Sequence, residues 1–222
     1  MKKNVLIVLI VFSTFDLFGQ ISKGDIIISF DGNYMKTNSE NGVTTNMINT
    51  NVQYLSIGSS LGYFFSNQFL MGIGLDYNWG KETRFNEIYF NNFLQQEEMD
   101  IKSRVLLPNI YLGFYFPIIS KLYFNTNLNF NYGIVKSDYK TFYAGAGPSF
   151  NSYSKSSAKE SKSDYFSSRI CPELTYFISS KISLCLGLGG IKYSLIDWKN
   201  ENSNWTVNFN PSYWEFGIKI KI

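Results

Sequence analysis

The segment LYFNTNLNFNYGI, residues 122–134, alternates two sets of side chains for thirteen positions. One set contains Leu122, Phe124 and Leu128, and the other contains Asn125 and three further asparagines. A period of two places the two sets on opposite faces of an extended strand. The segment therefore predicts a strand with one apolar and one polar face, about twice the usual length of roughly 5–6 residues.

The same alternation recurs along the chain and predicts an all-β fold with eight strands. Pro108 predicts a bulge or an interrupted ladder within its strand, because proline cannot donate to a neighbour. The phase of the alternation shifts at Gly189 and Gly190, as a bulge would cause. The predicted strands span residues 24–36, 52–65, 69–79, 101–116, 122–135, 165–177, 182–193 and 214–222.

The connections between these strands alternate between short and long. In an up-and-down antiparallel order, all short turns lie at one end of the molecule and all long loops at the other. The pattern predicts an eight-stranded antiparallel up-and-down β-barrel. The short connections are 66–68, 117–121 and 178–181, and the long ones are 37–51, 80–100, 136–164 and 194–204.

The first residues have the features of a secretory signal peptide. Lys2 and Lys3 precede an apolar run that ends before the small residue Gly19. The run is shorter than the roughly 20 residues of a spanning helix, and Asp16 interrupts it. We expect a signal peptide at residues 1–19, cleaved before Gln20, and a barrel domain at residues 20–222.

The residue types on the two faces indicate which face meets lipid. The polar faces consist mostly of Gly, Ser and Asn, which suit the narrow interior of an eight-stranded barrel. A soluble barrel would instead carry Lys, Glu and Thr along its outer face. Outward-facing Leu, Ile and Phe with Tyr or Trp near the strand ends are typical of strands that cross a membrane. The pattern therefore favours a transmembrane barrel.

On this pattern the chain resembles the small bacterial outer-membrane β-barrels, the OmpA- and OmpX-like eight-stranded family. The closing segment WEFGIKIKI resembles the family's C-terminal signal for the barrel-assembly machinery, with Ile222 in place of the terminal aromatic residue. The signal peptide and the eight lipid-facing strands predict a monomer in the cell outer membrane, surrounded by outer-membrane lipid and with both termini in the periplasm. The lengths of the outer connections favour a structural or surface-interaction protein whose long loops meet an unidentified extracellular ligand. The alternative is a narrow porin-like channel for ions or small solutes.

The composition argues against other functions. The chain contains no histidine, and barrel enzymes of the family typically use one as general base, so we expect no enzyme. Its 20 basic and 17 acidic residues are interspersed in the sequence, which predicts no nucleic-acid partner. No metal site or cofactor is expected, because the loops lack a cluster with ligand spacing.

Six ionisable residues are predicted to point into the barrel. Buried charges are costly unless paired, so the pattern favours an ion-pair network in the lumen over a selective path for a solute. Arg169 and Glu173 share a face of one strand but lie about 13 Å apart along it, so their partners must come from other strands. The six residues are Asp31, Asp76, Arg169, Glu173, Glu215 and Lys219.

Cys171 and Cys185 both point inward on neighbouring strands that flank a short turn. The oxidising periplasm permits a disulfide. A turn centred near Ile178 would place the two residues opposite one another, whereas a turn centred one residue later would make them diagonal and too far apart. The sequence leaves both outcomes open.

Two long connections have distinctive compositions. Residues 86–100 mix aromatic side chains with Glu97, Glu98 and Asp100, which favours an extended hairpin above the membrane with a solvated acidic tip over a site for a partner or a cation. Residues 151–164 contain few apolar side chains and are expected to be mobile.

Overall fold

The computed structural model describes residues 21–43, 46–90, 93–147, 150–196 and 202–222, so the predicted signal peptide lies outside the described residues. None of the described segments forms a helix that is long and apolar enough to cross a bilayer. The elements are β1 (Ile26–Val43), β2 (Asn46–Phe64), β3 (Phe69–Phe90), β4 (Phe93–Ile119), β5 (Leu122–Gly147), β6 (Phe150–Phe177), β7 (Ile182–Gly187), β8 (Gly190–Ile196), β9 (Asn202–Asn208), the 3-10 helix η1 (Pro211–Tyr213) and β10 (Glu215–Lys221).

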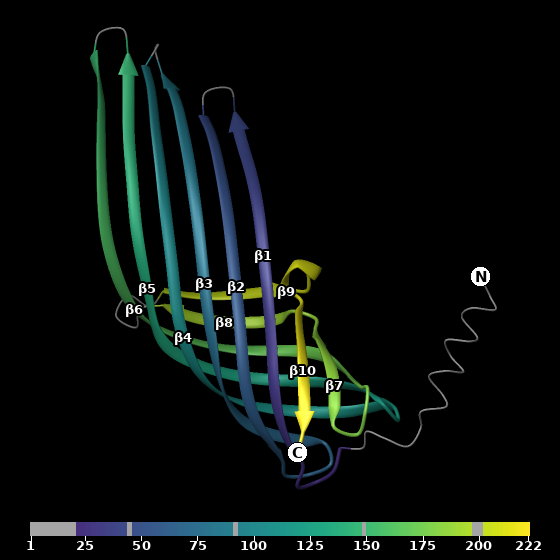
Figure 1. Cartoon of the computed structure of the whole chain (residues 1–222). Coiled ribbons are helices and arrows are strands. Elements are labelled where there is room, and N and C mark those ends of the chain that lie inside the picture. The colour runs from purple at the N-terminus through teal and green to yellow at the C-terminus, as the bar shows by residue number, and fades with distance from the viewer. Residues whose placement is uncertain (1–20, 44–45, 91–92, 148–149, 197–201) are drawn as a thin grey trace, which may run out of the picture.

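Eight of these strands form a closed antiparallel ring (Figure 1). Strands β1 to β6 pair in chain order, β6 pairs with β7, β7 with β10, and β10 with β1. Lys219 on β10 lies between Ser29 on β1 and Ser183 on β7, so the C-terminal strand closes the ring. The predicted eight-stranded up-and-down barrel is confirmed.

The strand predicted for residues 182–193 is broken in the middle. β7 and β8 are separated at Gly189, whose φ of 83° is unfavourable for other residues. A Cβ atom on Gly189 would also collide with the backbone oxygen of Asn208. The phase shift predicted here is therefore confirmed. The β8–β9 hairpin lies beside β6, where the tall strands leave the barrel (Figure 1). At Pro108 the β4–β5 ladder is interrupted and then resumes in the same register.

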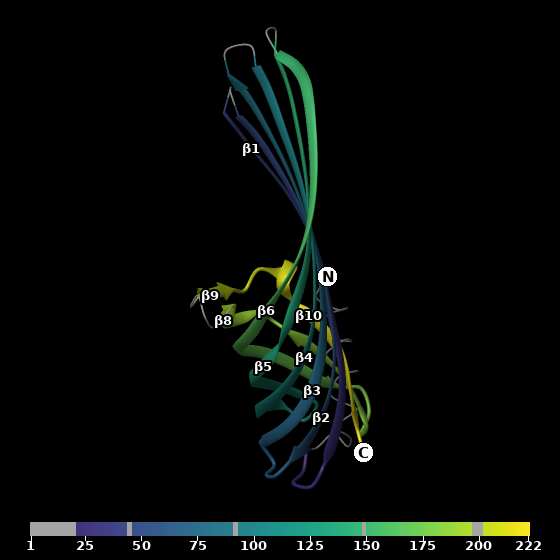
Figure 2. The same cartoon turned by 90° about the vertical axis from the view of Figure 1, so that its left-hand side faces the viewer.

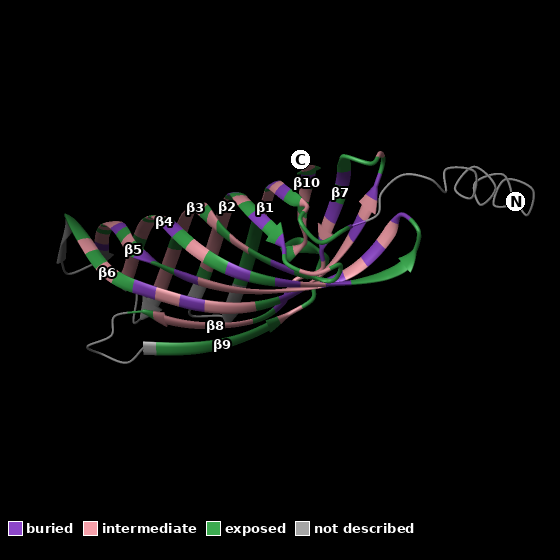
Figure 3. Ribbon diagram, turned by 90° about the horizontal axis from the view of Figure 1, so that it is seen from below, coloured by how far each residue is buried: buried purple, intermediate pink, exposed green. Residues whose placement is uncertain are grey.

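Burial alternates along the strands of the barrel, as the colours of the ribbon in Figure 3 show. Asn125, Ser167 and Ser183 are buried in the interior, whereas Ile73 is 63% exposed on the outside. The predicted assignment of the polar face to the lumen is confirmed. The outward-facing apolar side chains, here called the apolar belt, include Phe30, Ile57, Leu61, Met71, Ile73, Ile110, Leu112, Ile170, Leu184 and Ile218.

The prediction of long loops is wrong for three of the four connections, residues 37–51, 80–100 and 136–164. Strands β1 to β6 continue through them, as the pairs Lys36↔Gln53 and Asp138↔Glu160 show. These six strands rise beyond the barrel as a tall twisted sheet (Figures 1 and 2). The prediction recognised a strand by its apolar face. In these segments both faces meet water, and the strands are held together by backbone hydrogen bonds without an apolar face. We call the outer parts of β1–β6 (33–43, 46–56, 78–90, 93–105, 135–147 and 150–163) the protruding sheet.

The two connections with distinctive compositions belong to this sheet. Residues 86–90 and 93–100 pair with each other as the outer ends of β3 and β4, so this segment is an extended hairpin, and its position above a membrane stays a prediction. Residues 151–164, expected to be mobile, lie within β6 and pair with β5.

Candidate functional site

The lumen is filled with apolar and aromatic side chains at the end with the short turns. Phe64 and Tyr115 are fully buried there, with ring centroids 5.1 Å apart in an edge-to-face arrangement. Tyr123 and Phe177 pack in the same way at 5.5 Å. We call this cluster the lumen plug, and its members are Ile21, Ile27, Phe64, Leu70, Tyr111, Tyr115, Tyr123 and Phe177.

The lumen plug was not predicted from the sequence. Its only sequence signals are large side chains on otherwise polar faces, such as Ile27 between Asp25 and Ser29. Aromatic rings that pack edge to face leave no continuous file of water between them. The plug therefore closes the lumen at the short-turn end.

A buried ion pair between Lys219 and Glu173 lies directly above the lumen plug. The ammonium group of Lys219 also donates to the hydroxyl oxygen of Tyr115 at 2.9 Å, which joins the pair to the plug. Asn125 and Thr175 each donate to Oε1 of Glu173 at 2.8 Å. With several partners for each charge, this cluster offsets the desolvation of both ions.

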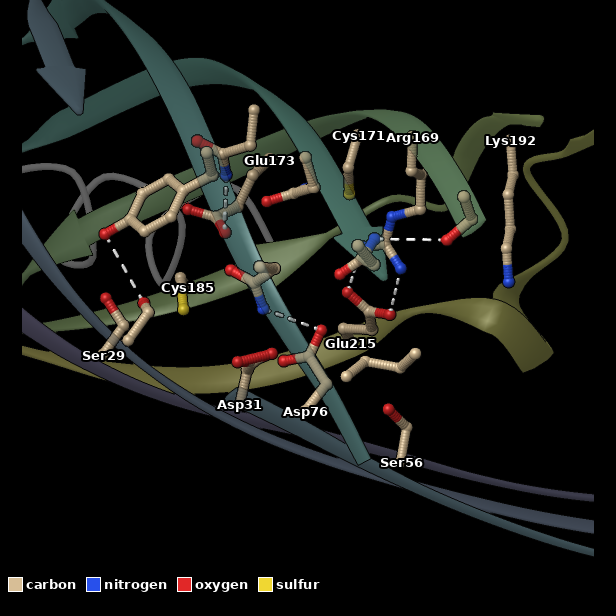
Figure 4. Close-up of a pocket in the computed structure, with 18 of the residues that line it drawn as sticks. Ser29, Asp31, Ser56, Asp76, Arg169, Cys171, Glu173, Cys185, Lys192 and Glu215 are labelled. Atoms are coloured by element: carbon tan, nitrogen blue, oxygen red, sulfur yellow. Dashed lines mark hydrogen bonds and ion pairs between the residues drawn. The ribbon is translucent and has the colours of Figure 1, made fainter. Parts of the chain in front are cut away.

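A second ion pair lies closer to the mouth of the barrel. Both terminal nitrogens of Arg169 donate to the carboxylate of Glu215, one of them at 2.6 Å, in the parallel arrangement that guanidinium groups favour (Figure 4). The structure thus pairs Arg169 and Glu173 with residues of β10 and not with each other.

Asp31 and Asp76 have no such partner. They lie on either side of Gly58 in the register of β1, β2 and β3. A Cβ atom on Gly58 would approach one carboxylate oxygen of Asp31 at 2.6 Å and one of Asp76 at 2.7 Å. Asn109 donates to Asp76 at 3.1 Å, and no ion pair among the described residues includes either aspartate. Of the six predicted residues, four therefore form two separate ion pairs, and the other two, Asp31 and Asp76, are neighbouring carboxylates without a cationic partner.

These groups surround a cavity of about 140 Å³ in the lumen (Figure 4). A wider cavity of about 470 Å³ lies at the mouth, between the base of the protruding sheet and the β8–β9 hairpin. Tyr54, Arg169, Lys192 and Glu215 line both cavities. The Arg169–Glu215 pair therefore forms part of the boundary between the mouth and the inner lumen.

The disulfide between Cys171 and Cys185 is not formed, and both thiols are free and buried. Cys185 lies opposite Thr175, four positions from Cys171, which corresponds to roughly 13 Å along the strand. The turn is centred two residues beyond Ile178, because Phe177 pairs with Ser183. The two cysteines are therefore further apart than either of the two predicted turns would place them, and too far apart for a disulfide.

No group of three potential metal-ligating side chains gathers among the residues that the structure describes. Above the barrel, three ion pairs join charges of the described part of the protruding sheet, and the pair of Lys81 with Asp100 is loose, at 3.9 Å. A hydrogen bond to the Glu97 carboxylate raises the pKa of Tyr143, because it stabilises the protonated phenol.

The protruding sheet has two free edges. β1 pairs with β10 only up to Gly32, so residues 33–43 of β1 face no other described strand on that side. β6 pairs with β8 only between Tyr165 and Ile170, so residues 150–164 form the other edge. Figure 2 shows the sheet standing clear of β8 and β9. Each free edge presents unpaired backbone N–H and C=O groups.

The comparisons with known proteins give only distant likenesses. No family model and no curated protein matches the chain. Among solved structures, the chain is similar to the outer membrane protein OprG of Pseudomonas aeruginosa, with 14% identity, a TM-score of 0.39, and coverage of 92% of this chain and 98% of that one. It is also similar to Ail, the attachment invasion locus protein of Yersinia pestis (12%, 0.37, 90% and 99%), and to the N-terminal β-barrel domain of P. aeruginosa OprF (11%, 0.35, 90% and 98%). At these scores the likenesses have no bearing on what this chain does.

Proposed function

We propose that this protein is a monomeric barrel of the bacterial outer membrane that presents the protruding sheet at the cell surface and binds a partner there. The observation that carries the proposal is the free edge of a sheet that extends far beyond the barrel. An exposed edge binds an extended segment of another protein through main-chain hydrogen bonds.

The apolar belt supports placement in a membrane. On β3 the outward face is apolar or aromatic from Phe69 to Trp79. Ten steps of about 3.3 Å, tilted by about 40°, span roughly 25 Å, which matches the apolar band of an outer-membrane barrel. The short turns then face the periplasm and the protruding sheet faces outward. Export through the signal peptide at residues 1–19 belongs to the same proposal.

The two edges differ in how well they are protected against pairing. Lys155, Lys159 and Lys162 lie along the β6 edge, and lysines are a common means of discouraging strand addition. Between Lys36 and Glu40, the β1 edge carries only Thr37, Asn38 and Ser39. We therefore assign the β1 edge as the docking strand, and an extended polypeptide as the class of partner.

Cross-linking on intact cells tests this assignment. A photoactivatable thiol reagent is attached to N38C on the β1 edge and to K159C on the β6 edge as the matched control, while the native cysteines are buried in the folded barrel. We expect a defined adduct from N38C alone, and loss of that adduct when prolines are introduced at positions 37 and 39. Equal adducts at both edges, or adducts that are insensitive to proline, would contradict the proposal.

A narrow channel is the second candidate. The polar lumenal cavity and the unpaired carboxylates of Asp31 and Asp76 favour it, since they suit a small cation. The lumen plug and the Lys219–Glu173 pair argue against steady flow. Planar-bilayer recording of the wild type and of the R169A/E173A variant separates the two functions. We expect silence in both, whereas cation-selective openings that change in the variant would favour the channel. Since the chain lacks histidine, no enzymatic role is proposed.

A further inference from the structure

Basic side chains gather on the outer face of the protruding sheet, where the sheet leaves the barrel. The strand registers place Trp79, Arg104, Lys136 and Lys162 side by side in one row across β3 to β6. The next row outward contains Lys36, Lys81 and Lys102 on β1, β3 and β4. We call the six basic residues of these rows the basic band: Lys36, Lys81, Lys102, Arg104, Lys136 and Lys162.

The opposite face of the same strands carries no charge at this height. Its row runs through Met35, Tyr54, Gly80, Ser103, Ser137 and Ser161. The next row outward on this opposite face carries Glu82 and Lys159, one charge of each sign. The excess of basic residues therefore lies on the face that continues into the apolar belt.

Most of the basic band has no acidic partner. Asp138 and Glu160 are the only acidic residues in the two rows, and Asp138 is paired with Arg104 at 2.9 Å. Lys81 lies 3.9 Å from Asp100, one row further out. Among the described residues, the exposed side chains of Lys36, Lys102, Lys136 and Lys162 take part in no ion pair.

The position of the basic band defines the kind of ligand. Tyr34 and Trp79 lie in its inner row, and aromatic residues of this type mark the membrane interface. Directly below them, Ile57, Leu106 and Ile134 are half exposed on the outer wall. A ligand that spans both regions must carry hydrocarbon next to the belt and a compact anionic group one or two residues above it.

We propose that the basic band binds the phosphate groups of anionic lipids in the outer leaflet, on the outside of β1 to β6. The lysine stems lie along the wall while the ammonium groups reach the headgroup level. Each basic side chain near an anionic membrane surface adds to binding, and phosphate is a strong acceptor for ammonium groups. This inference rests on the proposed placement of the barrel in a membrane.

The test uses the full-length folded protein and two lipids. Diphosphorylated lipid A and zwitterionic phosphatidylcholine are titrated into detergent-solubilised protein, and bound lipids are counted by native mass spectrometry. The variant K136Q/K162Q removes two adjacent charges of the basic band. The matched control K155Q/K159Q removes two exposed lysines from the opposite face of the same hairpin.

We expect the wild type and K155Q/K159Q to prefer lipid A, and K136Q/K162Q to bind it about 10- to 30-fold more weakly. A second variant, K36Q/K102Q, should also bind lipid A more weakly than the wild type. It tests the inference independently if K136Q/K162Q does not fold. Equal weakening in the control, or no preference for lipid A in the wild type, would overturn the inference. Failure of the wild type to fold into phosphatidylcholine bilayers would instead overturn the proposed membrane placement.

Discussion

The protruding sheet continues six of the eight strands of the barrel, yet the two regions differ in what surrounds their side chains. In the barrel, inward side chains are buried among polar partners and the lumen plug, and outward side chains form the apolar belt. In the protruding sheet, both faces carry polar and charged groups, and its ion pairs are exposed, such as Arg104 with Asp138.

This difference shows that one backbone ladder can serve two purposes. Within the barrel, the ladder is closed and each side chain has one fixed environment, so substitutions there should be costly. Beyond the barrel the ladder is open and its side chains are solvated, so equivalent substitutions should have small effects. Matched pairs of substitutions in the two regions test this directly.

The largest expected contrast is between two lysines in ion pairs. K219M leaves Glu173 buried without its cation and should destabilise the protein by about 3–5 kcal/mol. K81M removes the loose pair with Asp100 in the protruding sheet and should cost at most about 1 kcal/mol. Urea unfolding in phospholipid vesicles, followed by tryptophan fluorescence, measures both. Similar losses for the two variants would show that the regions do not differ in burial.

The next contrast uses two outward positions of β5. Leu128 lies midway along the apolar belt, and L128R should cost about 2–4 kcal/mol because it places a charge in hydrocarbon. Phe142 lies on the same face of the protruding sheet, and F142R should change stability by less than about 0.5 kcal/mol. The same vesicle assay applies, and a neutral L128R would show that this face does not meet lipid.

Two glycines provide a smaller contrast. In G58A, the new methyl group must displace the carboxylates of Asp31 and Asp76, so we expect a loss of about 1–3 kcal/mol. At Gly80 the nearest atom to an added Cβ is the backbone oxygen of Gln53 at 3.9 Å, so G80A should stabilise the sheet by about 0.5 kcal/mol. Unfolding midpoints give both values, and a stabilised G58A would contradict the crowding of the two carboxylates.

The smallest effect is expected from shortening the protruding sheet. Replacing residues 140–158 with an Asn-Gly turn removes the outer part of the β5–β6 hairpin but leaves the pair Tyr139↔Lys159 to close it. The free energy of unfolding of the barrel should stay within about 1 kcal/mol of the wild-type value, because the deletion affects only the part of the hairpin beyond the barrel. The heat-dependent shift of the folded form on gels checks that the barrel remains intact. Loss of this shift would show that the sheet supports the barrel.

The lumen shows how far the residues of a site can be predicted from one sequence. Alternation placed Arg169, Glu173, Glu215 and Lys219 on inward faces, because the period of a strand fixes the direction of each side chain. It could not identify which acid pairs with which base, since partners on neighbouring strands depend on register. The lumen plug was missed for a related reason, because Ile27 and Tyr115 look like isolated exceptions until the strands bring them together.

The sequence by itself determined the strand period, the lipid-facing and lumenal faces, and the number of strands, because these depend only on neighbours along the chain. The tertiary structure alone decided the relations between strands. It separated Cys171 from Cys185 by register, extended six strands into the protruding sheet, and gathered six dispersed basic residues into one band. The physical reason is that alternation is local, whereas register is set by turns and backbone hydrogen bonds between residues far apart in sequence.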